Sequence, residues 1–194
     1  MSADGSPPEA HPDRLRWNAK YAGGFVPSFV PHPLAVRALA MNLRDGPVAD
    51  LACGASGSAL LAAGRGREVT AVDISEVALG MLADEARIRG LDQLVTLVHA
   101  DLAVWRPRPG WYALVLGTGF WAADVFAVAA GAVAATGLIA WEAFTAEATR
   151  TRSDLSPDWC LAPGEPASLL PADFAVLDEQ DLPNRRRQML ARRQ

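Results

Sequence analysis

Two aspartates and a glycine-bearing turn have the residue types and spacing of a nucleoside-binding site. The turn is the segment Asp50-Leu-Ala-Cys-Gly54, and Asp73 ends the next apolar segment, about 20 residues further on. A turn of small residues lets a ligand approach the backbone closely. A carboxylate after the next strand can accept hydrogen bonds from both hydroxyls of a ribose. The spacing therefore predicts that Asp50, Gly54 and Asp73 surround a nucleoside.

The charge beside the turn indicates which nucleoside would bind. A dinucleotide site needs the pattern G-x-G-x-x-G and places a pyrophosphate over the N-terminus of the following helix. This sequence has Gly54-Ala-Ser-Gly57 instead, and the Asp50 carboxylate would repel a pyrophosphate. The same carboxylate suits S-adenosylmethionine, whose sulfonium and α-ammonium groups are cationic. We therefore expect S-adenosylmethionine as the cofactor and disfavour the alternative of a nicotinamide-dependent oxidoreductase.

An alternation of strands and helices must position these residues. Ser56 and Ser75 are expected to cap the helices that follow the first and second strands. Helices between strands that are apolar on both faces indicate a parallel sheet, and a short link between the last two strands indicates an antiparallel pair. The predicted fold class is α/β, a three-layer, doubly wound, Rossmann-like sheet that is mostly parallel with an antiparallel C-terminal strand. The predicted strands are residues 48–52, 68–72, 94–98, 112–116, 138–141, 174–179 and 187–191.

Length and composition favour one acidic domain. The 194 residues carry a net charge of −4, and 51% of them are hydrophobic. We expect residues 1–13 to form a disordered tail and residues 14–194 to form the domain, in which residues 14–46 are an N-terminal helical lid. The negative charge argues against a nucleic-acid partner, and no apolar run is long enough for a membrane span. Without a signal-peptide pattern, the expected localisation is cytoplasmic.

Two cysteines and a C-terminal arginine cluster have structural interpretations. Cys53 and Cys160 match neither a disulfide framework nor a zinc pattern, so no metal is expected. Arginines at 185–187 and at 192–193 fall in or beside the last predicted strand. We interpret them as solvated charges that protect an edge strand from aggregation.

Four stretches of the sequence occur in an order that is typical of one family. They are Arg16-Trp-Asn-Ala-Lys-Tyr21 with Pro27-Ser-Phe29, Asp50-Leu-Ala-Cys-Gly54, Gly137-Leu-Ile-Ala-Trp-Glu-Ala-Phe-Thr145, and Leu161-Ala-Pro-Gly-Glu165. They resemble the class I S-adenosylmethionine-dependent methyltransferases, and they are similar to the small-molecule branch that includes the tellurite-resistance-type enzymes. The resemblance implies methyl transfer to a small-molecule acceptor and a final helix after Glu165. Ala52 and Ser56 replace two glycines of the family pattern.

The resemblance also assigns roles within the donor site. Asp50, Ala52, Cys53 and Gly54 would form the turn around the methionine part of the donor. The other donor residues would be Asp73 at the ribose, Ile74 at the adenine face, Asp101 and Leu102 at the adenine edge, Gly117 after the fourth strand, and Trp17 and Tyr21 as the lid.

The acceptor side is less defined. Thr118 and Trp121 are expected to face the methyl acceptor, whose reacting atom could be sulfur, oxygen, nitrogen or a metalloid. Glu142 and His99 are the candidate general bases, although a soft acceptor would need little help from a base. Asp73 is expected to face water in the empty protein, so that its loss would weaken donor binding but not folding. We expect a monomer or homodimer, and the alternative function is a degenerate fold that binds a ligand or partner without catalysis.

Overall fold

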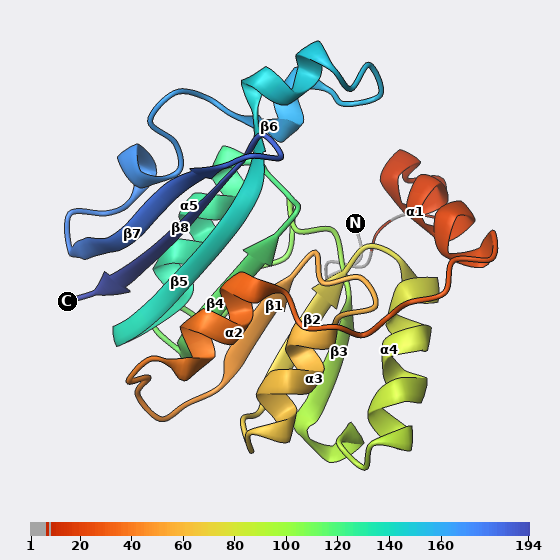
Figure 1. Cartoon of the computed structure of the whole chain (residues 1–194). Helices are drawn as coiled ribbons and strands as arrows, with labels where there is room; N and C mark the ends of the chain where they lie inside the picture. The colour runs from red at the N-terminus through yellow and green to blue at the C-terminus, as the bar shows by residue number, and fades with distance from the viewer. Residues whose placement is uncertain (1–6, 8) are drawn as a thin grey trace.

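An eight-stranded sheet forms the centre of the molecule (Figure 1). The structure, a computed structural model, describes residue 7 and residues 9–194. The strand order is β3-β2-β1-β4-β5-β8-β7, and β6 pairs with β5. The strands are β1 (Val48–Leu51), β2 (Val69–Asp73), β3 (Val95–His99), β4 (Tyr112–Thr118), β5 (Val133–Thr145), β6 (Cys160–Leu161), β7 (Phe174–Leu182) and β8 (Arg186–Arg193). The helices are α1 (Pro12–Ala22), α2 (Pro33–Ala40), α3 (Gly57–Gly64), α4 (Glu76–Ile88) and α5 (Ala123–Ala132), with short 3-10 turns η1 (Asp92–Leu94), η2 (Ala146–Arg150), η3 (Pro157–Trp159) and η4 (Ala167–Leu169).

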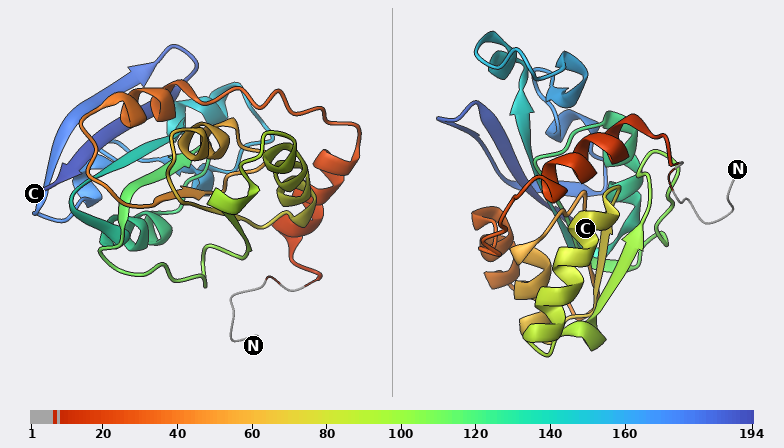
Figure 2. Two further views of the ribbon diagram at one scale, coloured as in Figure 1. Left: turned by 90° about the horizontal axis from the view of Figure 1, so that it is seen from below. Right: turned by 90° about the vertical axis from the view of Figure 1, so that its right-hand side faces the viewer.

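Helices cover both faces of this sheet (Figure 2). α2, α3 and α4 pack on one face, and α5 packs on the other. β1 to β5 pair in parallel, whereas β8 is antiparallel to both β5 and β7. Because both faces are covered, the central strands are mostly apolar, and all four residues of β1 are buried, Asp50 included. The predicted fold class, a mostly parallel three-layer sheet with an antiparallel C-terminal strand, is confirmed.

The N-terminal and C-terminal segments differ from the sequence prediction. α1 begins at Pro12 with His11 as its N-cap, so the last residues of the predicted tail belong to a helix. Residues 1–6 and residue 8, which the predicted disordered tail also included, lie outside the described residues. The final helix expected after Glu165 is only the three-residue turn η4, because prolines lie on both sides of it.

The strands of the C-terminal half also differ from the prediction. β5 begins directly after α5 and runs for 13 residues, whereas the apolar pattern indicated only residues 138–141. Its extension beyond Trp141 is stabilised by β8, which pairs with β5 from Leu138 to Phe144. β8 lies between β5 and β7, so the edge strand is β7. The interpretation of the β8 arginines as edge-strand charges is therefore wrong.

Both serine caps are confirmed. Ser56 Oγ accepts hydrogen bonds from the N–H groups of Ser58 and Ala59 at the start of α3. Ser75 Oγ accepts one from the Ala78 N–H at the start of α4. The two helices therefore start close to the carboxyl ends of β1 and β2, where the sequence places the binding site.

A segment before α2 crosses the start of α3 and needs a glycine beneath it. This segment, residues 23–32, is named the strap. An added Cβ at Gly57 would come within 2.5 Å of backbone carbons of Phe29 and Val30. At the end of the strap, the His32 N–H donates a hydrogen bond to Ser58 Oγ at 3.0 Å. Gly57 thus lets the strap pack directly on α3.

Gly57→Ala should destabilise the protein, because the strap backbone would have to move away from α3. The expected loss of unfolding free energy is about 1–3 kcal/mol, as for overpacking elsewhere. Gly80→Ala is the matched control, since Gly80 lies inside α4 and an added Cβ there meets nothing within 4 Å. The control should gain about 1 kcal/mol from the helix propensity of alanine. Urea unfolding measures both variants, and shifts of the same sign would contradict the strap packing.

Candidate functional site

A cavity of about 620 Å³ lies at the carboxyl ends of β1, β2, β3 and β4. The strand order reverses between β1 and β4, which is where doubly wound sheets bind ligands, and the volume is typical of a small-molecule site. The predicted residues that line the cavity are Trp17, Tyr21, Ala52, Cys53, Gly54, Asp73, Ile74, Asp101, Leu102, Thr118 and Trp121. Among the described residues, four predicted members do not line it: Asp50, His99, Gly117 and Glu142.

Asp73 ends β2 and joins two backbone segments of the cavity wall. Its Oδ2 accepts a hydrogen bond from the Gly54 N–H at 2.7 Å, and its Oδ1 accepts one from the Ser75 N–H at 2.8 Å. Burial raises the pKa of Asp73, although these two N–H groups oppose the shift. The residue is only 7% exposed, so the expectation that it faces water is wrong. A carboxylate has about four lone-pair sites, so each oxygen keeps acceptor capacity for a ligand hydroxyl.

The turn after β1 holds two residues in the left-handed region. Ala52 has φ 49° and Gly54 has φ 58°. This conformation costs about 1–2 kcal/mol for a residue with a Cβ, so Ala52 is strained where the family has glycine. An added Cβ at Gly54 would overlap the Tyr21 hydroxyl. Burial, and then the charge of Asp73, raise the pKa of Tyr21 to about 12, so an uncharged phenol lies on the turn.

Asp50 lies beneath the turn and does not face the cavity, in contrast to the sequence prediction. It is 1% exposed and accepts a hydrogen bond from Ser56 Oγ at 2.6 Å. Burial raises the pKa of Asp50 to about 6 although the Ser56 hydrogen bond opposes the shift, and the charge of Asp73 adds to it. The Ser56 side chain is turned toward Asp50. The carboxylates that line the donor side of the cavity are instead those of Asp13, Asp73 and Asp101.

The end of β3 supplies the wall where adenine is expected. Ile74 and Leu102 line it with apolar side chains. Asp101 Oδ1 accepts a hydrogen bond from the Ala103 N–H at 2.9 Å, and Asp101 Oδ2 lies 3.5 Å from His11 Nε2. Asp101 therefore caps the turn after β3 and also lines the cavity.

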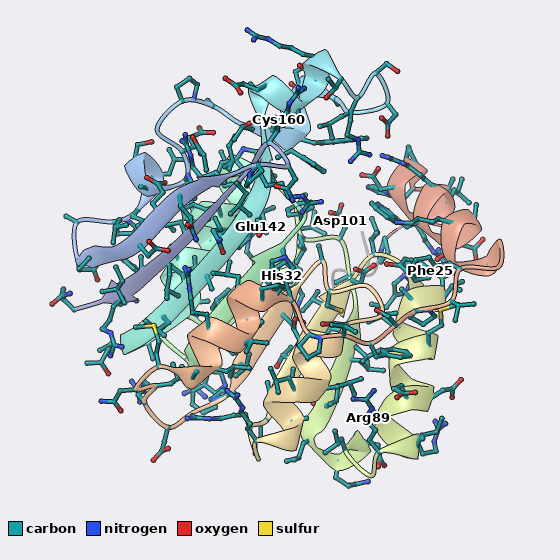
Figure 3. The ribbon with its side chains drawn as sticks, in the orientation of Figure 1. Phe25, His32, Arg89, Asp101, Glu142 and Cys160 are labelled. Carbon is teal, nitrogen blue, oxygen red and sulfur yellow. The ribbon has the colours of Figure 1, made fainter. Side chains whose placement is uncertain are left out.

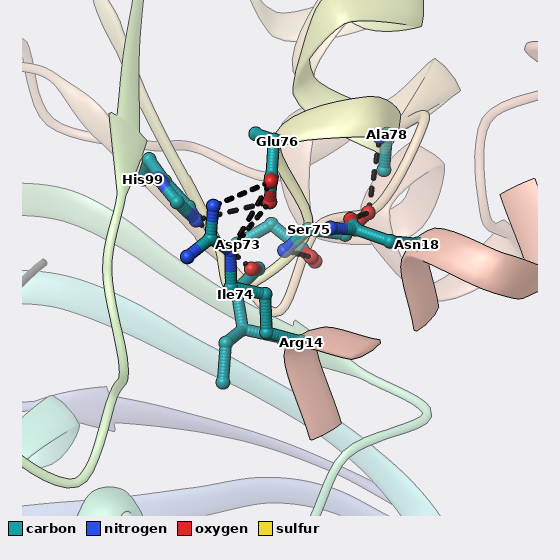
Figure 4. A network of polar contacts seen from close by, with 8 residues as sticks. All are labelled: Arg14, Asn18, Asp73, Ile74, Ser75, Glu76, Ala78 and His99. Carbon is teal, nitrogen blue, oxygen red and sulfur yellow. Dashed lines mark hydrogen bonds and ion pairs between the residues drawn. The ribbon is translucent and has the colours of Figure 1, made fainter. Parts of the chain in front are cut away.

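A polar network docks α1 on the start of α4 (Figure 4). Arg14 donates three hydrogen bonds, of 2.6 to 3.1 Å, to the Glu76 carboxylate. This pairing lowers the pKa of Glu76 to about 2. Ser75 Oγ donates to Asn18 Oδ1 at 2.7 Å. Because Asp73 binds the Ser75 N–H, α1 is attached to the same turn that carries the candidate ribose-binding carboxylate.

Neither candidate base lines the cavity. His99 Nε2 lies 3.1 Å from the carbonyl oxygen of Ile74, after β2, and 3.3 Å from Glu76 Oε2, so this nitrogen faces two acceptor oxygens. Glu142 is 4% exposed and lies 3.4 Å from His32 and 3.2 Å from Arg186 (Figure 3). Burial alone would raise the pKa of Glu142, but the contacts with His32 and Arg186 outweigh it and lower the pKa. Glu142 is thus paired with Arg186, and His99 lies beside two acceptor oxygens; neither side chain is among the residues that line the cavity.

The loop after β4 forms the part of the cavity where the methyl acceptor is expected. Thr118 and Trp121 line the cavity as predicted. Gly117 instead packs beneath Trp141, where an added Cβ would come within 2.6 Å of the indole ring. Trp121 packs edge-on against Trp141 with ring centres 6.4 Å apart, and it also contacts Phe126. Trp121 therefore belongs to both the core and the cavity wall.

Several cavity residues lie outside the four sequence motifs. His11 falls within the predicted tail, and Arg186 belongs to the misinterpreted arginine cluster. The pairing register of β8 could have identified Arg186 as a cavity residue, because Arg186 pairs with Phe144 near the carboxyl end of β5. The lining residues that sequence analysis did not assign to the site are His11, Asp13, Lys20, Ala100, Ala103, Gly119, Ala122, Asp124, Val125, Asp158, Trp159 and Arg186.

Metal chemistry and thiol chemistry have little support at this site. Among residues 7 and 9–194, no three His, Cys, Asp or Glu side chains are grouped so that they could hold a metal ion. Burial raises the pKa of the Cys53 thiol well above its ordinary value, so this residue is a poor nucleophile. Over the same described residues, no helix combines the length and apolar character that crossing a bilayer requires.

The buried Asp50 carboxylate should make stability depend on pH. Its folded-state pKa of about 6 exceeds the ordinary 3.8, so its stabilising contribution is complete below about pH 4 and is lost as pH rises through about 6. Asp50→Asn keeps an acceptor oxygen for Ser56 but carries no charge. The variant should be more stable than the original protein at pH 7.5, by up to about 3 kcal/mol, with the difference shrinking toward pH 4.

Urea unfolding at several pH values measures this difference. Asp92→Asn, in the exposed turn η1, is the control and should show a much smaller change. A stability difference for Asp50→Asn that stays constant from pH 4 to pH 7.5 would contradict the assignment of a buried, titrating carboxylate.

Solved structures of low sequence identity share this architecture, although no protein-family model and no curated protein sequence matches the chain. Geranyl diphosphate C-methyltransferase from Streptomyces coelicolor A3(2), solved with Mg²⁺, geranyl diphosphate and S-adenosyl-L-homocysteine, has a TM-score of 0.68 at 13% identity, covering 96% of this chain and 99% of that one. An S-adenosylmethionine-dependent methyltransferase from Mesorhizobium loti has a TM-score of 0.66 at 17% identity, covering 82% and 96%.

The fold is thus shared with enzymes of more than one activity. The [4+2]-cyclase SpnF has a TM-score of 0.64 at 17% identity, covering 82% of this chain and 79% of that one. These structures do not point to the tellurite-resistance-type branch. The strand order, the antiparallel C-terminal hairpin and these similarities together show that the chain has the fold of the class I S-adenosylmethionine-dependent methyltransferases.

Proposed function

We propose that this protein transfers a methyl group from S-adenosylmethionine to a small molecule. The observation that carries the proposal is the Asp73 carboxylate at the end of β2, the strand next to the reversal of strand order between β1 and β4. It adjoins the left-handed turn at Gly54, and its two oxygens keep acceptor capacity for two neighbouring ribose hydroxyls. One protein of similar structure was solved with S-adenosyl-L-homocysteine, which is consistent with this use of the fold.

The residues around Asp73 fit the remaining parts of the donor. Ile74 and Leu102 offer apolar walls for adenine. The turn from Ala52 to Gly54 offers close backbone approach to the methionine part. When bound, S-adenosylmethionine supplies an electrophilic methyl group on a cationic sulfur.

The charge of the cavity favours this donor over a dinucleotide. Asp13, Asp73 and Asp101 all line it, and they would repel a pyrophosphate while attracting the cationic groups of the methyl donor. This argument replaces the one based on Asp50, whose carboxylate lies beneath the turn.

The protein would contribute mainly alignment to the reaction. Methyl transfer is an in-line displacement, and holding the acceptor in line with the methyl group lowers the barrier by proximity. Glu142 contacts Arg186 and His32, and neither Glu142 nor His99 is part of the cavity lining, so we assign neither of them the removal of a proton from the acceptor. We therefore favour an acceptor whose nucleophile is soft or already ionised, such as a sulfur or metalloid centre, over a neutral oxygen or nitrogen.

We also propose that residues 14–46 act as a lid. Trp17 and Tyr21 line the cavity, and contacts from α1 to Ser75 and Glu76 hold the helix closed over it. Gly24, the second residue of the strap, has φ 90° and supplies a flexible point shortly after the end of α1.

Asp73→Ala should weaken binding of S-adenosylhomocysteine by a few hundredfold. Two charge-assisted hydrogen bonds to the ribose would be lost, which corresponds to about 3–4 kcal/mol. Stability should also fall, because the N–H groups of Gly54 and Ser75 would lose their acceptor at about 1–3 kcal/mol each. Calorimetry with S-adenosylhomocysteine, together with thermal unfolding of each variant, measures both effects.

Three comparisons make the test specific. Asp73→Asn keeps one acceptor oxygen and should fall between the original protein and Asp73→Ala. Asp92→Ala removes an exposed carboxylate and should bind normally. NAD should not bind.

Unchanged affinity in a folded Asp73→Ala protein would show that this carboxylate is not at the ribose. Absence of S-adenosylhomocysteine binding to the original protein would refute the proposed function. Binding without methyl transfer to any acceptor in a screen would favour the non-catalytic alternative.

A further inference from the structure

An arginine of the interior strand β8 reaches the acceptor side of the cavity. In the antiparallel register, Arg186 lies opposite Phe144, and Gln188 lies opposite Glu142. Residues two apart on a strand share a face, so Glu142, Phe144 and Arg186 are neighbours on one face of the sheet. The Arg186 guanidinium lies 4.0 Å from the centre of the Phe144 ring, and its Nη1 donates to Glu142 Oε1 at 3.2 Å. Ring and carboxylate together fix the guanidinium where it lines the cavity.

Glu142 is itself held from the other side by the strap. His32 Nδ1 accepts a hydrogen bond from the Leu34 N–H at 3.2 Å, as the N-cap of α2. The proton of the neutral imidazole is therefore on Nε2, which lies 3.4 Å from Glu142 Oε1. Figure 3 shows these two side chains side by side. Glu142 thus acts as a clamp that positions Arg186.

The guanidinium keeps donor capacity for a ligand. It carries five N–H donors, and within the described residues its hydrogen-bond partner is Glu142 alone. Gly119 lies beside it without a side chain, and an added Cβ there would lie 3.5 Å from Arg186 Nη1. A planar, preorganised fork of this kind matches the oxygens of a carboxylate or phosphate.

We infer that Arg186 binds an anionic group of the methyl acceptor, a carboxylate or a phosphate, and that the apolar part of the acceptor lies against Phe120 and Trp159. The inference rests on the proposed function, which assigns this side of the cavity to the acceptor. Phe120 and Trp159 line the cavity together with Arg186. Arg186 is therefore a specificity-determining residue for acceptor charge.

Two carboxylates on the same side do not cancel this cation. Asp124 and Asp158 also line the cavity, but both residues are exposed, so water and salt screen their charges. Asp124 Oδ1 additionally accepts a hydrogen bond from the Val125 N–H. The Arg186 side chain is only 23% exposed, so its field in the cavity is less screened.

A series of probes with one shape and different charge tests the inference. Benzoate, benzamide and benzylamine share the ring and differ in charge, and phenyl phosphate is the phosphate arm. Their dissociation constants are measured by ligand-observed NMR, with and without saturating S-adenosylhomocysteine. We expect benzoate or phenyl phosphate to bind about tenfold to a hundredfold more tightly than benzamide, with benzylamine the weakest.

Variants of β8 identify the residue responsible. Arg186→Gln should lower the affinity for the anionic probes to that for benzamide, without changing benzamide binding. Arg186→Lys keeps the charge but not the fork, and should retain part of the preference. Arg193→Gln is the matched control: Arg193 is also on β8, pairs with Asp173 at 2.7 Å and is not part of the cavity lining. It should keep the full preference.

The outcomes separate this inference from the proposed function. The inference would be overturned if benzoate and benzamide bound equally or not detectably, or if benzylamine bound more tightly than benzoate. It would also be overturned if the preference for anions persisted in Arg186→Gln, or if it vanished equally in Arg193→Gln. If Arg186→Gln does not fold, the dissociation constants are measured on Arg186→Lys. An undiminished preference of that variant for benzoate would contradict recognition by the guanidinium fork. Loss of S-adenosylhomocysteine binding with the anion preference intact would instead remove the donor assignment alone.

Discussion

The carboxylate of Asp73 is the group on which the geometry of the cavity depends. It binds the N–H of Gly54, in the turn after β1, and the N–H of Ser75, at the start of α4. A buried N–H group without a hydrogen-bond partner costs about 1–3 kcal/mol, so the folded protein keeps both N–H groups within reach of the carboxylate. The distance between the turn and the start of α4 is fixed in this way. Asp73 also lines the cavity, and each of its oxygens keeps acceptor capacity beyond these two bonds. α1 depends on this arrangement as well, because it is docked on Ser75 and Glu76.

Features of the site that are set by local spacing could be predicted from sequence. The apolar segment from Val69 ends at Asp73, and Ser56 and Ser75 cap helices by contacts with residues two or three positions away. Such features depend on the period of strands and helices and on capping chemistry, which a single sequence displays. The prediction that Asp73 lies at the cavity is accordingly correct, and only its expected exposure to water is wrong.

Features that depend on contacts between distant segments could not be predicted in the same way. Asp50 was expected beside the ligand, but one hydrogen bond to Ser56 holds its carboxylate beneath the turn. Arg186 was interpreted as an edge charge, because the sequence does not show that β7 continues the sheet beyond β8. His11 reaches the cavity only because α1 folds back on α4. In each case the side chain's environment comes from a contact that local patterning does not encode.

Ser56 and Gly57, at the start of α3, connect the turn at Gly54 with the part of the cavity that Arg186 lines. Ser56 satisfies the buried Asp50 carboxylate, and Gly57, directly after it, leaves room for the strap to cross α3. The strap ends at His32, whose imidazole binds Glu142, and Glu142 in turn positions Arg186. A glycine at position 56 would leave Asp50 without that hydroxyl, and a side chain at position 57 would displace the strap that carries His32. Ser56 and Gly57 are therefore part of the packing that connects the turn at Gly54 with the Arg186 cation that lines the cavity.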